Sequence, residues 1–260
     1  AGLTITPESN DDADFALTVT ATSTDGADTA NTVDIINVTV NAVADAPTLT
    51  VADATGNEDE AIALTVSSAL TDASESLAIT IAGVPAGASL NNGTDNGDGS
   101  WSLTSVDLAG LTVTPASNDD ADFALAVTAT STDGADTADT VDTINVTVNA
   151  VADAPTLSVS DATGNEDQAI ALTVSSALTD ASESLAITIS GVPAGASLNN
   201  GTDNGDGSWS LTSADLAGLT VTPASNDDSD FALTVTATST DGADTADTVD
   251  TINVTVNAVN

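Results

Sequence analysis

The chain has 260 residues, of which 40 are acidic and none is Lys, Arg or His, so its formal net charge is −40. It also contains no Cys, Met or Tyr. Without His or Cys there is no conventional zinc, haem or iron–sulfur site and no His-activated nucleophile. A pair of carboxylates is the main catalytic option that remains, and we expect the chain not to be an enzyme.

The same composition bears on partners and on folding. Without cationic side chains the chain would repel nucleic-acid phosphates, so we expect no nucleic-acid partner. Hydrophobic residues make up 41% of the chain, which predicts a folded core rather than disorder. The sequence has no run of about 18 apolar residues, so this segment is not expected to insert into a membrane.

The sequence repeats itself with a period of 108 residues. Residues 45–152 align with residues 153–260 without a gap and differ at 8 positions. Residues 1–44 match the C-terminal part of the same repeat, so we predict three domains: half of a preceding repeat (1–44) and two full repeats (45–152 and 153–260). Either the half-repeat belongs to a longer polypeptide, which we favour, or another chain completes it.

Within a repeat, Val, Ile, Thr and Leu alternate with small polar residues, which is typical of half-buried strands. Gly-, Asn-, Asp- and Pro-rich turns separate these segments. Ser105–Leu108 is predicted to form one helical turn capped by a Ser. In the half-repeat, three strands are predicted in the segments GLTITP, FALTVTATS and VDIINVTVNA. In the first full repeat the predicted strands are 48–53, 61–68, 77–84, 100–104, 110–115, 123–131 and 141–150, with residues 88–91 as a candidate eighth.

Seven or eight short strands in about 100 residues predict an Ig-like β-sandwich of two antiparallel sheets. One apolar face per strand fits this packing. The fold class expected is therefore all-β, with one sandwich for each full repeat.

Four segments of the repeat are distinctive: GVPAGA, GTDNGDGSW, DLAGLT and DFALxVTAT. With them, the whole chain resembles the tandem extender repeats of large bacterial RTX-type adhesins, which are cadherin-like or bacterial Ig-like modules. The resemblance implies Greek-key sandwiches arranged head to tail as an elongated rod. It also implies a secreted, calcium-stiffened stalk at the cell surface that holds a binding tip and supports adhesion or biofilm formation. The acidic loop Asp72–Glu75 is shorter than the DxDGSE loop of many relatives.

The acidic loops predict calcium sites, because Ca²⁺ takes about six to eight hard oxygen ligands. Strand direction reverses at each turn, which places residues 56–59 and 118–122 at the C-terminal end of a sandwich. Residues 72–75 and 133–136 then lie at the N-terminal end. Stacking one repeat on the next would bring both kinds of end together. The predicted ligands are Asp12, Asp14, Asn41, Asp45, Asp72 and Glu75 at the first junction, and Glu58, Asp59, Asp120, Asp122, Asn149, Asp153, Asp180 and Glu183 at the second.

Three features of the sequence each allow two interpretations. The TDNGDG segment is a hairpin turn or a turn that also binds an ion. Residues 133–136 are a solvated hairpin tip or part of a cation site. Trp101 and Trp209 are core residues or platforms on which a sugar stacks.

The function that these features favour is a structural extender of an extracellular, cell-surface adhesin, with calcium at the junctions and neighbouring repeats of the same chain as partners. One alternative is a subunit of an extracellular filament or surface layer in which like chains share strands. Another is a glycan- or cell-binding repeat that acts by avidity.

Overall fold

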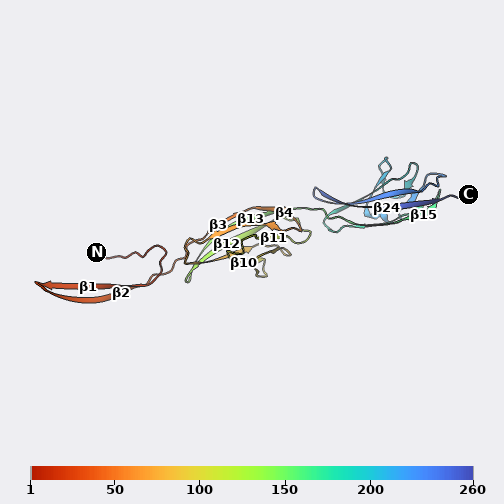
Figure 1. The fold of residues 1–260 in the computed structure, drawn as a ribbon. Helices are drawn as coiled ribbons and strands as arrows, with labels where there is room; N and C mark the ends of the chain where they lie inside the picture. The colour runs from red at the N-terminus through yellow and green to blue at the C-terminus, as the bar shows by residue number, and fades with distance from the viewer. Residues whose placement is uncertain (1, 260) are drawn as a thin grey trace. The chain divides into compact units, whose positions relative to one another are not determined.

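The computed structural model describes residues 2–259, which contain β-strands and one short 3₁₀ helix (Figure 1). Contacts divide the chain into two units. Unit 1 comprises Ala1–Ser117 and Ala121–Val148, and unit 2 comprises Asn118–Asp120 and Asn149–Asn260. The domain boundaries at 44/45 and 152/153 stay a prediction.

The half-repeat in unit 1 forms one β-hairpin, β1 (Phe15–Asp25) and β2 (Asp28–Val38), paired in antiparallel register. Gly26 at its turn has φ +61°, a conformation that glycine adopts without steric cost. The predicted strand in GLTITP is wrong, since residues 2–8 are not in a strand. In the full repeat the matching strand at residues 112–114 pairs with residues 62–63 and 89–90, and the described residues 2–44 contain no counterpart of those two partners.

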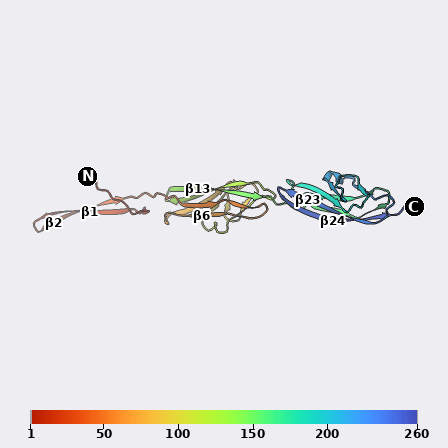
Figure 2. The ribbon, with the colours of Figure 1, turned by 90° about the horizontal axis from the view of Figure 1, so that it is seen from above.

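The rest of unit 1 is a sandwich of two layers (Figures 1 and 2). One layer is a six-stranded sheet in the order β4-β13-β12-β7-β10-β9. The other layer combines a pair, β3-β6, with a three-stranded sheet, β5-β11-β8. The strands are β3 (Thr48–Ala52), β4 (Ala54–Asn57), β5 (Ile62–Ala63), β6 (Thr65–Ala69), β7 (Ser76–Ala82), β8 (Ser89–Leu90), β9 (Thr94–Asp95), β10 (Ser100–Leu103), β11 (Thr112–Thr114), β12 (Phe123–Asp133) and β13 (Asp136–Asn149).

Unit 2 repeats this sandwich, with a six-stranded sheet β15-β24-β23-β18-β21-β20, a three-stranded sheet β16-β22-β19 and a pair β14-β17. The pair β15–β24 is parallel, and the other strand pairs among the described residues of this unit are antiparallel. The strands are β14 (Thr156–Ser160), β15 (Ala162–Asn165), β16 (Ile170–Ala171), β17 (Thr173–Ala177), β18 (Ser184–Ser190), β19 (Ser197–Leu198), β20 (Thr202–Asp203), β21 (Ser208–Leu211), β22 (Thr220–Thr222), β23 (Phe231–Asp241) and β24 (Asp244–Asn257).

The predicted fold class is confirmed: each full repeat is an all-β sandwich of the Ig-like kind. Prediction missed β4, by which the chain passes from the small layer to the edge of the large sheet. Asp53 fixes this crossing, because its Oδ1 accepts hydrogen bonds from Asn145 N at 2.9 Å and Nδ2 at 3.0 Å. The segment ATGN of β4 lacks the alternation of bulky apolar residues on which strand prediction depends.

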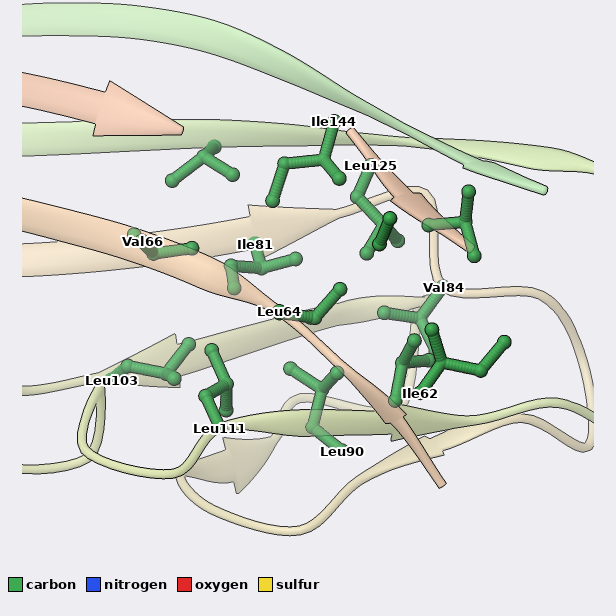
Figure 3. Close-up of a cluster of buried hydrophobic side chains, with 14 of the residues drawn as sticks. Ile62, Leu64, Val66, Ile81, Val84, Leu90, Leu103, Leu111, Leu125 and Ile144 are labelled. Carbon is green, nitrogen blue, oxygen red and sulfur yellow. The ribbon is translucent and has the colours of Figure 1, made fainter. Parts of the chain in front are cut away.

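The core of each sandwich is aliphatic and fills the space between its layers (Figure 3). Ile81, Leu125 and Ile144 are each 0% exposed. Trp101 and Phe123 are half-buried and pack against the margin of this core. Each of these two aromatic side chains thus belongs to the core in part, which agrees with the interpretation of Trp101 as a core residue.

The predicted helical turn is a 3₁₀ helix in unit 2, η1 (Ser213–Leu216), and an irregular turn at residues 105–108 of unit 1. The cap is Thr212 rather than a Ser. Its backbone N and its Oγ1 donate hydrogen bonds to Asp215 Oδ2 at 2.8 and 2.6 Å. These bonds lower the pKa of Asp215.

Ile144 and Ile36 occupy the same position of the repeat but differ in burial, 0% against 53% exposed. We expect Ile144→Ala to lower the free energy of unfolding by about 3 kcal/mol, because it leaves a cavity in the core. Ile36→Ala should change it by less than about 1 kcal/mol, because little buried surface is lost. Urea unfolding followed by Trp101 emission in a Trp209→Phe background measures both, and equal losses would contradict the proposed packing.

Candidate functional site

Three carboxylates meet at one end of the unit 1 sandwich. Asp45 lies before β3, and Asp72 and Glu75 lie in the turn between β6 and β7. One carboxylate oxygen of each lies within 4.8 Å of the others. A calcium ion contacts its oxygen ligands at about 2.3–2.6 Å, so a single ion can touch all three. Three of the predicted ligands are thus brought together, and we call them the acidic triad.

Glu75 is the most buried member of the acidic triad, at 7% exposed. Its Oε1 accepts a hydrogen bond from Asp45 N at 2.6 Å. Its Oε2 is buried and has no hydrogen-bond partner among the described residues. A buried charged oxygen without a donor is destabilising, so this atom fits a bound cation better than it fits the protein alone.

Local hydrogen bonds hold the other two members in place. Asp72 Oδ1 accepts from Ser74 N at 2.9 Å. The backbone and the hydroxyl of Ser74 lower the pKa of Asp72 and so favour its ionised form. Asp45 Oδ2 accepts from Asn10 Nδ2 at 3.2 Å, which links the triad to the half-repeat.

The β12–β13 hairpin adds two carboxylates that lie outside the predicted set. Desolvation, followed by repulsion from Asp12, Glu75 and Asp72, raises the pKa of Asp133. Asp136 Oδ2 accepts a hydrogen bond from Ala44 N at 3.0 Å. The sequence does predict residues 133–136 at this end of the sandwich. It does not distinguish a solvated hairpin tip from part of a cation site.

The half-repeat lines the approach to the acidic triad. A cavity of about 290 Å³ is bordered by Asp12, Asn41, Asp45 and Asp133, among others.

Asp14, by contrast, stabilises its own repeat, because its Oδ1 accepts a hydrogen bond from Val40 N at 2.9 Å. Asp122 makes the same bond to Val148 N, also at 2.9 Å. In each of these two predicted ligands, one carboxylate oxygen already accepts a hydrogen bond from a backbone N–H group.

Unit 2 repeats the environment of Glu75 at Glu183. Among the described residues, however, Asp153, Asp180 and Glu183 do not form a close group like the acidic triad. Glu183 is 7% exposed, its Oε1 accepts from Asp153 N at 2.5 Å, and its Oε2 is buried without a partner among the described residues. Asp180 is 8% exposed. Hydrogen bonds from the hydroxyl and backbone of Ser182 lower its pKa. The unpartnered glutamate oxygen is therefore a property of the repeat and not of one copy.

The remaining predicted ligands are divided between the units. Glu58 (3% exposed) and Asp59 (φ +57°) belong to unit 1, and Asp120 and Asn149 belong to unit 2. Whether they join Asp153, Asp180 and Glu183 around one ion stays a prediction.

Unit 2 shows how the C-terminal end of a repeat is built. Asp167 Oδ1 accepts from Asn226 N at 3.0 Å, and Glu166 Oε1 accepts from Val259 N at 2.7 Å. The first connection and the loop before the penultimate strand therefore lie at the same end, as their strand directions predicted.

Searches for similar proteins give no family assignment. No family model matches the sequence, and no curated protein matches it significantly. Similar solved structures include an endo-fucoidan hydrolase of glycoside hydrolase family 107 (20% identity, TM-score 0.27, 94% of this chain and 34% of that chain) and Drosophila N-cadherin EC1-4 (14%, 0.29, 96% and 60%). A further one is a SusE-like surface located polysaccharide binding protein of Bacteroides thetaiotaomicron (11%, 0.28, 85% and 35%).

This chain spans about a third of the length of the hydrolase and 60% of that of the N-cadherin segment. At TM-scores of 0.27 to 0.29 these matches do not bear on function. The Ig-like assignment rests on the sheet topology. Among the described residues, no helix has the length and apolar character needed to cross a membrane.

We expect Asp133 and Asp72 to titrate on opposite sides of the ordinary aspartate range, because the pKa of Asp133 is raised and that of Asp72 is lowered. Protonation of Asp133 relieves repulsion, so its contribution to stability grows as the pH falls through its raised folded-state pKa. The contribution of Asp72 is present above its unfolded-state pKa and is lost as the pH falls through its lowered folded-state pKa. Carboxyl-carbon NMR in chelator measures both, and coincident titrations would contradict the geometry.

Proposed function

We propose that this chain is a structural extender of an extracellular, cell-surface adhesion protein, and that it is not an enzyme. The observation that carries the proposal is the buried, unpartnered Oε2 of Glu75, which recurs at Glu183. Both copies keep the arrangement although the repeat differs at 8 of 108 positions. A repeated module with a cation site at its end adds length and a stiff joint with each copy.

Calcium is the ion we propose for the site. The donors at hand are carboxylate and amide oxygens, with no His or Cys, which favours Ca²⁺ over zinc. Asp45, Asp72 and Glu75 would hold the ion, and Asp12, Asn41 and Asp133 line the adjoining space. Two positive charges would offset repulsion that the chain itself cannot neutralise.

Stiffening follows from where these ligands lie in the chain. Asp45 is in the linker before β3, Asp72 and Glu75 are in a turn of the sandwich, and Asp12 belongs to the half-repeat. An ion that contacts oxygens from all three segments restricts their relative movement. We extend the same proposal to the second junction, with neighbouring repeats as each other's partners.

The extracellular location is part of the proposal. Calcium sites of extracellular modules typically bind with dissociation constants of about 10⁻⁴–10⁻³ M, which suits the millimolar calcium outside cells. At low calcium, 40 like charges would oppose compact folding. A segment that is less stable before export and gains stability in extracellular calcium suits a secreted stalk that supports adhesion or biofilm formation.

The test replaces Glu75 and Glu183 with Gln. We expect the double variant to bind Ca²⁺ at least about ten-fold more weakly, because each site loses a charged ligand. In chelator the variant should melt at or above the wild-type temperature, because the unpartnered buried charge is gone. Calorimetric titration and thermal melting with and without calcium measure these changes.

Glu60→Gln is the matched control, because the second repeat already carries Gln168 at this position. It removes the same charge from an exposed site and should leave calcium affinity unchanged. Wild-type melting and small-angle scattering that do not respond to excess chelator would rule out calcium stiffening.

The β1–β2 hairpin favours a second candidate, a filament in which like chains share strands. Val19 and Ile36 are 47% and 53% exposed, whereas Val127 and Ile144 at the same positions of the full repeat are both 0% exposed. In the full repeat, β7 pairs with β12 and the core covers this face. A strand from another chain would bury the same surface in the half-repeat.

Concentration-dependent association of this chain in calcium would support the filament. Val19→Asp should abolish it by placing a charge on the apolar face, whereas Thr20→Asp on the opposite face should not. Sedimentation velocity measures both. A chain that stays monomeric over the accessible concentration range would overturn this candidate and leave the extender proposal untouched.

A further inference from the structure

A second kind of cavity lies at the side of each sandwich, away from the acidic triad. In unit 1 it has a volume of about 410 Å³ and lies between the loop 84–88 and the β9–β10 hairpin. In unit 2 the equivalent cavity measures about 380 Å³. None of the predicted calcium ligands lines either cavity. In unit 1 its lining includes Val84, Pro85, Asp95, Asp98 and Trp101.

Trp101 and Asp95 are neighbours in this cavity. They lie directly opposite each other on β10 and β9, so their side chains project to the same face of the sheet with Cβ atoms about 5 Å apart. Trp101 also lies opposite Ile81, which is fully buried. The half-buried indole therefore packs against the core on one side and borders the cavity on the other, beside a carboxylate.

The β9–β10 turn supplies a second carboxylate and holds both in place. Asp95 Oδ1 accepts from Gly97 N at 2.8 Å, and Asp98 Oδ1 accepts from Ser100 N at 3.0 Å and Ser100 Oγ at 2.6 Å. Among the described residues, none donates a hydrogen bond to the Oδ2 atom of either aspartate. The bonds from Ser100 also lower the pKa of Asp98, so they favour its ionised form.

Charge decides what such a cavity can bind. An anionic ligand would meet two carboxylates and a chain of net charge −40, so phosphates and uronic acids are disfavoured. A neutral sugar can stack on an indole and donate hydroxyl hydrogen bonds to a carboxylate, but it carries no charge that offsets the two negative charges. An organic ammonium gains from both carboxylates and from attraction to the π-face of a tryptophan. The combination of Trp101, Asp95 and Asp98 thus favours a cation that carries apolar carbon.

We propose that each of these cavities binds an alkylammonium group, supplied by a free diamine or polyamine or by a lysine side chain of a peptide. The two sources share one chemistry, a protonated amine on a methylene chain. The proposal is independent of the calcium site and adds a binding activity to each repeat. Two cavities on one chain would let a ligand with several amines bind by avidity.

The chain contains its own reporter for this proposal. Its two tryptophans, Trp101 and Trp209, each line one cavity, and it contains no tyrosine. Cations that gather elsewhere on the acidic surface are therefore silent in fluorescence. At constant ionic strength and saturating calcium, putrescine should change the indole emission in a saturable way, and butanediol, its neutral analogue of equal length, should not.

Asp98→Asn combined with Asp206→Asn should weaken putrescine binding about five-fold, the loss of one partly exposed charge pair. The amide oxygen can still accept from Ser100 or Ser208, so the turn should keep its shape. Asp142→Asn with Asp250→Asn removes the same charge from exposed positions that do not line a cavity and should have no effect.

A lysine peptide and its acetylated form distinguish the two sources. A response to the unmodified peptide at lower concentration than to putrescine assigns the cavity to a protein partner, and the reverse order assigns it to free amines. An equal response to butanediol or to a neutral oligosaccharide would overturn the proposal, as would equal weakening by the control substitutions.

Discussion

Mutual repulsion among carboxylates is the constraint on which the rest of this structure depends. With 40 acidic residues and no cationic side chain, no side-chain ion pair can form, and the carboxylates must be stabilised by hydrogen bonds or by ions from solution. Many accept from nearby backbone N–H groups, as Asp11 does from Ala13 and Asp98 from Ser100. Such bonds stabilise the charged form. Where several acidic loops converge, backbone donors are too few, and an oxygen such as Glu75 Oε2 is left over.

The fold of the sandwich gathers carboxylates, and with them their mutual repulsion, at its ends. Aliphatic alternation places Leu, Val and Ile between the sheets, and the acidic residues are left to the turns. Antiparallel strands return every second turn to the same end, so Asp45, Asp72 and Glu75 meet although 30 residues separate the first from the last. The grouping of these carboxylates is thus a consequence of the topology, and an ion bound by all three would also tie the linker to the turn.

The sequence predicted what depends on periodicity and missed what depends on packing. Strands such as β7 and β12 alternate clearly and were found, whereas β4 and β9 contain no apolar alternation. Strand β4 forms on β13, a partner distant in the sequence, and β9 is a two-residue strand that pairs with β10 across a hairpin turn. For the site, chemistry and strand direction together identified Asp45, Asp72 and Glu75. They did not reveal that Glu75 is buried, that Asp14 Oδ1 accepts a hydrogen bond from Val40 N, or that desolvation and repulsion from nearby carboxylates raise the pKa of Asp133. Each depends on side-chain positions that residue type does not determine.

The differences between the two full repeats indicate which parts of the module are under constraint. Among the described residues, those at the 8 differing positions are exposed or half-buried, and none is a core residue of either sandwich. One of them exchanges Glu60 for Gln168 and so removes a charge, yet Glu75 and Glu183 are both retained. Of these two glutamate positions, the repeat varies the exposed one and keeps the one at which a buried charge is destabilising. Retaining that charge in a position that destabilises the empty protein is understandable if a cation normally compensates it.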